Sequence, residues 1–290
     1  MASVDTSLPA HPTGAAETFA SAHAAPHALK LYGGWFCPFV QRSWIVLHEK
    51  QIPHQYVEIN PYQKAPEFLA LNPRGLVPTL AVPTTSESAS DGEKENKPLY
   101  ESTIICEYLD EAYADEATYG TPLLPRGSDP ADVYARARCR LWIDHIGSKI
   151  VPGFYRVLQH TAEKDYSIDE AREAFLGHIR TFVKEMADGG PWFLGERFSL
   201  VDIILAPWAK RLFLIDHYKA GGVGIPSVGA TGDDEVWQRW RTWFDAITAR
   251  KSVQDTWSAD EMYIQAYKRY ADDTTQSEVA QATRKGQRLP

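Results

Sequence analysis

The chain has 290 residues, of which 44% are hydrophobic and 23% charged, so it can bury one large core or two ordinary ones. Its formal charge of −8 argues against a nucleic-acid-binding surface. The three cysteines are too few for a disulfide framework, and the cysteines and histidines do not have the spacing of metal ligands. No apolar run reaches the ~20 residues of a membrane span. The composition predicts a soluble cytoplasmic protein without a metal ion, a nucleic-acid partner or a stable membrane association.

The first and last segments of the chain are polar. Residues 1–28 are rich in Ala, Ser, Thr, Pro and His and lack Lys and Arg, which excludes a secretory signal or a transit peptide. We predict a disordered extension over residues 1–28 and a flexible tail over residues 271–290.

From residue 29 to residue 113, short apolar runs alternate with helical periods, in the order βαβαββα. This order predicts one small α/β domain with a central mixed sheet. The polar stretch 84–97 is interpreted as an exposed hairpin loop without a catalytic role. The expected strands are 29–32, 54–59, 76–82 and 98–100, and the expected helices are 38–50, 66–71 and 102–113.

Strands are not predicted beyond a linker at residues 114–130, and residues 131–270 form an all-helical domain. Pro152 should kink or end its first helix. Ser199 and Asp202 have the spacing of a capping box, and Trp237, Trp240 and Trp243 follow one helical face, which is typical of a core. The expected helices are 131–159, 167–187, 200–218, 235–251 and 258–270.

Cys37 stands between the first expected strand and the first expected helix. Pro38 suits the first helical position, which leaves Cys37 as the cap. The unpaired N–H groups of that helix end favour a thiolate, whose pKa at such positions is ~3.5–7.5. A lone cysteine is also often a small buried apolar residue, so position alone leaves both interpretations open.

Three further features could hold a small thiol peptide beside this cysteine. Pro78 opens the third strand, and a cis bond before it would turn the backbone of Val77 toward the thiol. The Glu101–Ser102 pair precedes a helix, with Ser102 as the expected N-cap, and a helix start with a hydroxyl suits a carboxylate. Lys64 could pair with a second carboxylate. Each feature also has an ordinary structural interpretation.

Three stretches together resemble the cytosolic glutathione transferases, and specifically their omega class. The resemblance is strong over residues 29–113 and weaker to about residue 270. The matching stretches are Phe36-Cys37-Pro38-Phe39, then Asn72-Pro73-Arg74-Gly75-Leu76-Val77-Pro78, then Tyr100-Glu101-Ser102-Thr103-Ile104-Ile105-Cys106-Glu107-Tyr108-Leu109-Asp110-Glu111-Ala112-Tyr113.

The resemblance implies a thioredoxin-like domain at residues 29–113, a helical glutathione-transferase domain at residues 131–270, and glutathione as co-substrate. It implies that Cys37 forms a mixed disulfide with glutathione, and that the backbone of Val77, followed by a cis Pro78, pairs with its cysteinyl part. The Glu101–Ser102 pair would hold the γ-glutamyl end and Lys64 the glycine carboxylate. The implied glutathione-binding residues are Phe39, Lys64, Val77, Pro78, Glu101 and Ser102.

The expected activity is that of a one-cysteine thioltransferase or reductase, acting by removal of glutathione from mixed disulfides or by reduction of the dehydroascorbate type. Cys106 should be buried and inert. The resemblance also implies a small electrophilic or disulfide substrate and a homodimer.

Three alternatives remain open at the level of sequence. The first is a transferase that conjugates glutathione to electrophiles, in detoxification or secondary metabolism, for which Cys37 is a poor residue. The second is a protein like the chloride intracellular channels, which share the Cys-Pro-Phe motif and a following Gln-Arg; polar residues in the helix at 38–50 argue against membrane insertion. The third is a glutathione-binding module without turnover.

Overall fold

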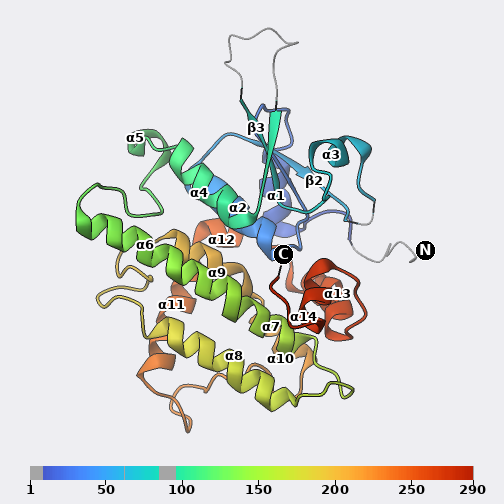
Figure 1. Cartoon of the computed structure of the whole chain (residues 1–290), viewed down its shortest axis with the longest axis vertical. Coiled ribbons are helices and arrows are strands. Elements are labelled where there is room, and N and C mark those ends of the chain that lie inside the picture. Colours follow the sequence, from blue (N-terminus) through green and yellow to red (C-terminus); the bar gives the residue numbers. More distant parts are fainter. Residues whose placement is uncertain (1–8, 62, 85–95, 290) are drawn as a thin grey trace. The chain divides into compact units, whose positions relative to one another are not determined.

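The computed structural model describes residues 9–61, 63–84 and 96–289. The chain divides into two compact units. The sheet unit comprises the chain up to Pro122 together with Lys251–Met262, and the helical unit comprises Leu123–Arg250 together with Tyr263–Pro290. Figure 1 shows the strands confined to the first of these.

Within the described residues, four strands form one mixed sheet in the order β2-β1-β3-β4. Strand β1 runs parallel to β2 and antiparallel to β3, and β3 is antiparallel to β4. The sheet unit contains α1 (Gly14–Ala22), β1 (Lys30–Gly33), α2 (Pro38–Glu49), β2 (Gln55–Glu58), α3 (Pro66–Leu71), β3 (Thr79–Pro83), β4 (Asn96–Tyr100), α4 (Ser102–Ala112), α5 (Glu116–Tyr119) and α12 (Lys251–Asp255).

Helices α2 and α4 lie side by side against the sheet (Figure 1). Their apolar residues recur at helical spacing, and Trp44, Ile45, Ile105 and Leu109 are fully buried. The predicted βαβαββα order is therefore confirmed, although several element ends differ by a few residues from those expected. Most of the predicted hairpin loop at residues 84–97 lies outside the described residues.

Part of the segment predicted to be disordered is helical, since α1 occupies residues 14–22. The Thr13 N–H donates to the hydroxyl of Ser258 over 3.1 Å, and the Ala259 N–H donates to the Thr13 hydroxyl over 3.1 Å. Ala16 of α1 is buried. The order of this segment thus depends on contacts with residues some 245 positions away, which composition does not reveal.

The helical unit is all-helical, as predicted. Among the described residues, none of the helices in either unit combines the length and the hydropathy that crossing a bilayer requires. The elements are α6 (Pro130–His145), η1 (Ile146–Ile150), α7 (Val151–Leu158), α8 (Ile168–Val183), α9 (Leu200–Lys210), α10 (Leu212–Tyr218), α11 (Glu235–Ala249), most of α13 (Asp260–Ala271) and α14 (Glu278–Arg284).

The first predicted helix of this unit is interrupted. Between α6 and α7 the backbone forms a π-helical turn, η1, just before Pro152 at the start of α7. Proline has no N–H and crowds the preceding turn, so the regular hydrogen-bond pattern is displaced there. A second difference is α14, which lies in the predicted flexible tail; Ser277 caps it, and Arg284 pairs with Asp273.

Asp202 organises the core of the helical unit. Its carboxylate accepts hydrogen bonds from the N–H and the hydroxyl of Ser199, which confirms the pairing predicted at this helix start. The same carboxylate also accepts from the Phe193 N–H and from the indole N–H of Trp243, both over 2.8 Å. Trp237, Trp240 and Trp243 are all buried, as the helical spacing predicts.

Candidate active site

The sheet register brings three loops to one edge. Tyr32, the penultimate residue of β1, pairs with Thr79, the first residue of β3, and Thr79 pairs with Tyr100, the last residue of β4. The segments that follow β1, precede β3 and follow β4 must therefore meet. These segments carry Cys37, Val77 and the Glu101–Ser102 pair.

Cys37 occupies the N-cap position of α2, with extended backbone angles, and Pro38 is the first helical residue. Its side chain is partly exposed, and the Sγ–H donates to the Val77 carbonyl oxygen over 4.0 Å. The other two cysteines, Cys106 and Cys139, are fully buried. Burial raises the pKa of the Cys106 thiol to about 12 and that of Cys139 to about 11.

The peptide bond between Val77 and Pro78 is cis. The turn just before it contains Gly75, whose φ of +63° suits glycine. A Cβ at Gly75 would lie 3.0 Å from the Nζ of Lys64. The ammonium group of Lys64 is therefore placed against the turn that leads to Val77.

The helix α4 begins at Ser102, the first residue of the expected range 102–113, but its N-cap is Glu101 and not Ser102. The expectation of a Ser102 cap is therefore corrected. Glu101 has a φ of +69° and makes no capping bond; its exposed carboxylate instead pairs with Arg74 at 3.1 Å. The first N–H groups of α4 remain available for an anion at this edge of the sheet.

Arg42, from the Gln-Arg pair that follows the Cys-Pro-Phe motif, is a further residue of the candidate site for which no site role was predicted. It lies on α2, is 3% exposed, and donates from Nη1 to the hydroxyl oxygen of Ser102 over 3.1 Å. Because that oxygen accepts from Arg42, the hydroxyl hydrogen of Ser102 can point elsewhere. The guanidinium also lies 5.3 Å from the ring centroid of Phe39. The signal that could have identified Arg42 is a charged residue within a mostly apolar stretch of the helix, where a buried charge needs a partner.

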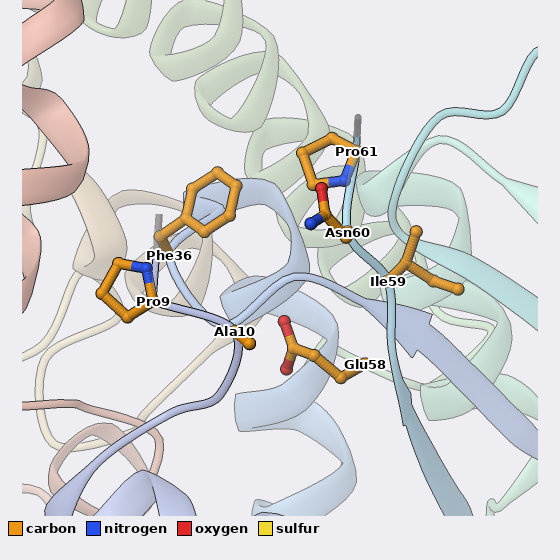
Figure 2. Close-up of a pocket in the computed structure, with 7 residues that line it drawn as sticks. All are labelled: Pro9, Ala10, Phe36, Glu58, Ile59, Asn60 and Pro61. Atoms are coloured by element: carbon orange, nitrogen blue, oxygen red, sulfur yellow. The ribbon is translucent and has the colours of Figure 1, made fainter. Parts of the chain in front are cut away.

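Glu58 is a second residue near Cys37 that was not among the predicted site residues. It ends β2, and its Oε1 accepts from the backbone N–H of Trp35 over 2.9 Å, while Oε2 accepts from the Tyr56 hydroxyl over 2.7 Å. Burial raises the pKa of this carboxyl group to about 7. Figure 2 shows the carboxylate directed into a small pocket. The pocket is lined by Pro9, Ala10, Phe36, Glu58, Ile59, Asn60 and Pro61.

Two family models match the chain. The glutathione S-transferase N-terminal domain matches residues 36–112, and the glutathione S-transferase C-terminal domain matches residues 165–246. Glutathione S-transferase omega-1 of Sus scrofa is 34% identical over 186 residues, which cover 63% of this chain and 67% of that protein.

Solved structures agree with this match. Glutathione transferase Omega 3C of Trametes versicolor superposes with a TM-score of 0.72 at 38% identity, covering 92% of this chain and 100% of its own. The rice transferase GST1, solved in complex with glutathione, superposes with a TM-score of 0.67 at 25% identity, covering 87% of this chain and 100% of its own. The chain therefore belongs to the glutathione transferase family, and its relatives include members of the omega class.

Proposed function

We propose that this omega-type transferase acts as a glutathione-dependent thioltransferase, with Cys37 as the nucleophile. The supporting observation is the contrast among its thiols. Cys37 is accessible at the start of α2, where helix N–H groups stabilise a thiolate. Cys106 and Cys139 are buried and hold their protons to high pH, which makes them poor nucleophiles.

The proposed reaction has two exchange steps. The Cys37 thiolate attacks the glutathione sulfur of a mixed disulfide, so that a Cys37–glutathione disulfide forms and the substrate leaves as its thiolate. A second glutathione thiolate then attacks the glutathione sulfur of that adduct. Oxidised glutathione leaves, and the Cys37 thiolate is restored. In the net reaction one free glutathione is consumed, the substrate thiol is released in reduced form, and the glutathionyl group it carried becomes half of the oxidised glutathione, so Cys37 needs no second cysteine.

Glutathione is proposed to bind along the loops at the sheet edge, within the domain of residues 29–113. The α4 N-terminus, with Ser102 and Glu101, suits the γ-glutamyl end, because N–H groups and a hydroxyl attract the carboxylate while Glu101 attracts the amino group. The Val77 backbone lies beside Cys37 and would pair with the cysteinyl part. Lys64 supplies a cation for the glycine carboxylate, and Phe39 and Pro78 supply apolar surface.

The direct test is intact-mass spectrometry after incubation with oxidised glutathione, followed by peptide mapping. We expect one adduct of glutathione, located on Cys37, that disappears on addition of reduced glutathione. The Cys106→Ser and Cys139→Ser variants serve as matched controls and should form the same adduct. An adduct on Cys106 or Cys139 with none on Cys37 would overturn the proposal.

A small disulfide or electrophile and a second copy of the chain are the proposed partners. Large apolar side chains are exposed in the sheet unit at Leu69, Tyr100 and Ile104, and a partner subunit would cover such surface. None of the three cysteines, all of which lie among the described residues, is in a disulfide, which supports function in a reducing compartment such as the cytoplasm. Light scattering on the purified chain would measure its molar mass and so distinguish a dimer from a monomer.

A further inference from the structure

The turn that leads to Cys37 is held at two points. The Cys37 N–H donates to the Gly34 carbonyl oxygen over 2.9 Å, which closes a tight turn over residues 34–37. The N–H of Trp35 lies inside the turn and takes no part in the bond that closes the turn. Its partner is Glu58, whose Oε1 accepts from it over 2.9 Å. A buried backbone N–H needs such a partner, so the carboxylate fixes the middle of the turn.

Glu58 is itself held in one orientation. It pairs with Gly33 in the parallel β1–β2 ladder, and the next residue, Ile59, donates its N–H to the Gly33 carbonyl oxygen. Its second carboxylate oxygen accepts from Tyr56, whose ring stacks on buried Trp44 at a centroid distance of 4.3 Å. The carboxylate therefore connects a packed sheet to the turn that carries the thiol.

We propose that Glu58 is a positioning residue for Cys37: its carboxylate, held by Tyr56, fixes the backbone of Trp35 and so places the thiol at the start of α2. This inference rests on the proposed function, because it assigns a role toward the nucleophile named there. Glu58 acts through the turn, because its carboxylate accepts from the Trp35 N–H and from the Tyr56 hydroxyl.

The charge of Glu58 decides how firmly the turn is held. A bond from an N–H to a carboxylate is about twice as strong as one to a neutral acceptor. Because the pKa of Glu58 is raised to about 7, protonation near neutral pH weakens this anchor. Among the described residues, the titratable side chain in contact with the carboxylate is that of Tyr56, which donates to it, while the neutral Asn60 lines the same pocket (Figure 2).

The first test follows the thiol. Alkylation of Cys37 by iodoacetamide, which needs no glutathione, is measured between pH 5.5 and 9 by mass spectrometry with peptide mapping. Wild type should show the titration of the thiol and a second inflection near pH 7. Glu58→Gln keeps an acceptor without the charge, so it should lose that inflection and react roughly threefold to tenfold more slowly at its plateau.

The matched control is Glu67→Gln, which makes the same change at an exposed position on α3 and should behave as wild type. Glu58→Ala removes the acceptor and should lower the plateau further than Glu58→Gln. A Glu58→Gln profile that coincides with wild type would overturn the proposal. Failure of the glutathione adduct while the alkylation inflection persists would instead count against the proposed function alone.

A second measurement does not depend on the folding of a variant at Glu58. The chain has nine tryptophans, and selective ¹⁵N labelling reports their backbone amides, with Trp35 assigned from the spectrum of Trp35→Phe. The Trp35 amide resonance should titrate with a midpoint near pH 7 in wild type. It should keep this midpoint in Cys37→Ser, which removes the thiol titration. A resonance that stays constant over this range, or that moves only when Cys37 is present, contradicts the role of Glu58.

Discussion

The Sγ of Cys37 lies 4.0 Å from the carbonyl oxygen of Val77, and the two residues are 40 positions apart in the chain. A carbonyl oxygen at this distance accepts from the protonated thiol and offers nothing to the thiolate. We therefore propose that the N–H groups at the start of α2, where Cys37 is the N-cap residue, stabilise the thiolate. Glutathione, bound along the Val77 backbone, would bring its own sulfur to the same place.

Replacement of Cys37 by serine should separate thiol exchange from conjugation. A hydroxyl is not a competent nucleophile toward disulfides, so thioltransfer should fall by roughly three orders of magnitude or more. A hydroxyl can still donate to the thiolate of bound glutathione, so conjugation to an electrophile such as a chlorodinitrobenzene should increase. Both activities are measured on one preparation, and thioltransfer that survives in Cys37→Ser would exclude the mechanism.

Arg42→Met should weaken the site at α4. Methionine retains the buried apolar stem but removes the donor to Ser102, so glutathione affinity should fall roughly fivefold and the free energy of unfolding by about 2 kcal/mol. A double-mutant cycle with Ser102→Ala should give a coupling near ~1 kcal/mol in glutathione binding. Additive effects of the two changes would show that the contact between them contributes nothing to the site.

His54 should make the protein less stable in acid. Its ring is 4% exposed and stacks on His23 at a centroid distance of 4.2 Å. Burial lowers the pKa of His54 to about 4, below its usual 6.5, so the native state binds fewer protons than the unfolded state between these values. The contribution of neutral His54 to the free energy of unfolding is fully present above pH 6.5 and is lost as the pH falls toward 4. At pH 5 the loss should be about 2 kcal/mol.

Urea denaturation at pH 7.5 and pH 5 measures this effect. Between pH 7.5 and pH 5, the change in unfolding free energy should be more favourable to the native state in His54→Gln than in wild type, by about that amount, because only the His54 contribution differs between the two proteins. His217→Gln, which changes an exposed histidine, is the control and should show the same change in unfolding free energy as wild type. Equal pH dependence in His54→Gln and wild type would show that His54 titrates normally.

Glu58 should have the opposite dependence. Its pKa is raised from 4.5 to about 7, so the native state binds more protons than the unfolded state between these values. The unfolding free energy should therefore decrease as pH rises through this range, by roughly 2 kcal/mol between pH 5 and pH 7.5. Glu58→Gln should lack this component, while Glu67→Gln keeps it. The same urea series checks both variants.

Asp202→Ala should be the most destabilising of these changes without altering chemistry at Cys37. It leaves the buried donors of Phe193 and Trp243 without their acceptor, at about 1–3 kcal/mol each. A loss of roughly 4 kcal/mol in unfolding free energy is expected. The alkylation rate of Cys37 in the folded fraction should stay that of wild type; a slower rate would show that Asp202 has a role beyond the core.

Local patterns in the sequence were sufficient to predict much of this structure. The βαβαββα order, the cap position of Cys37 with Pro38 behind it, the pairing of Ser199 with Asp202 and the buried tryptophans all follow from spacings of a few residues. Periodicity, capping and turn chemistry act over such short distances along the chain. A single sequence is therefore enough to predict the features that they determine.

The tertiary structure alone decided which distant groups meet. Arg42 and Ser102 are 60 positions apart, and Trp35 and Glu58 are 23 apart; each pair is joined because the sheet register and the packing of α2 on α4 bring their elements together. The N-terminal helix likewise depends on Ser258. A long-range contact has no local period, because the geometry of the whole sheet unit determines it. The thiol was therefore visible in the sequence, whereas the residues that hold it in place were not.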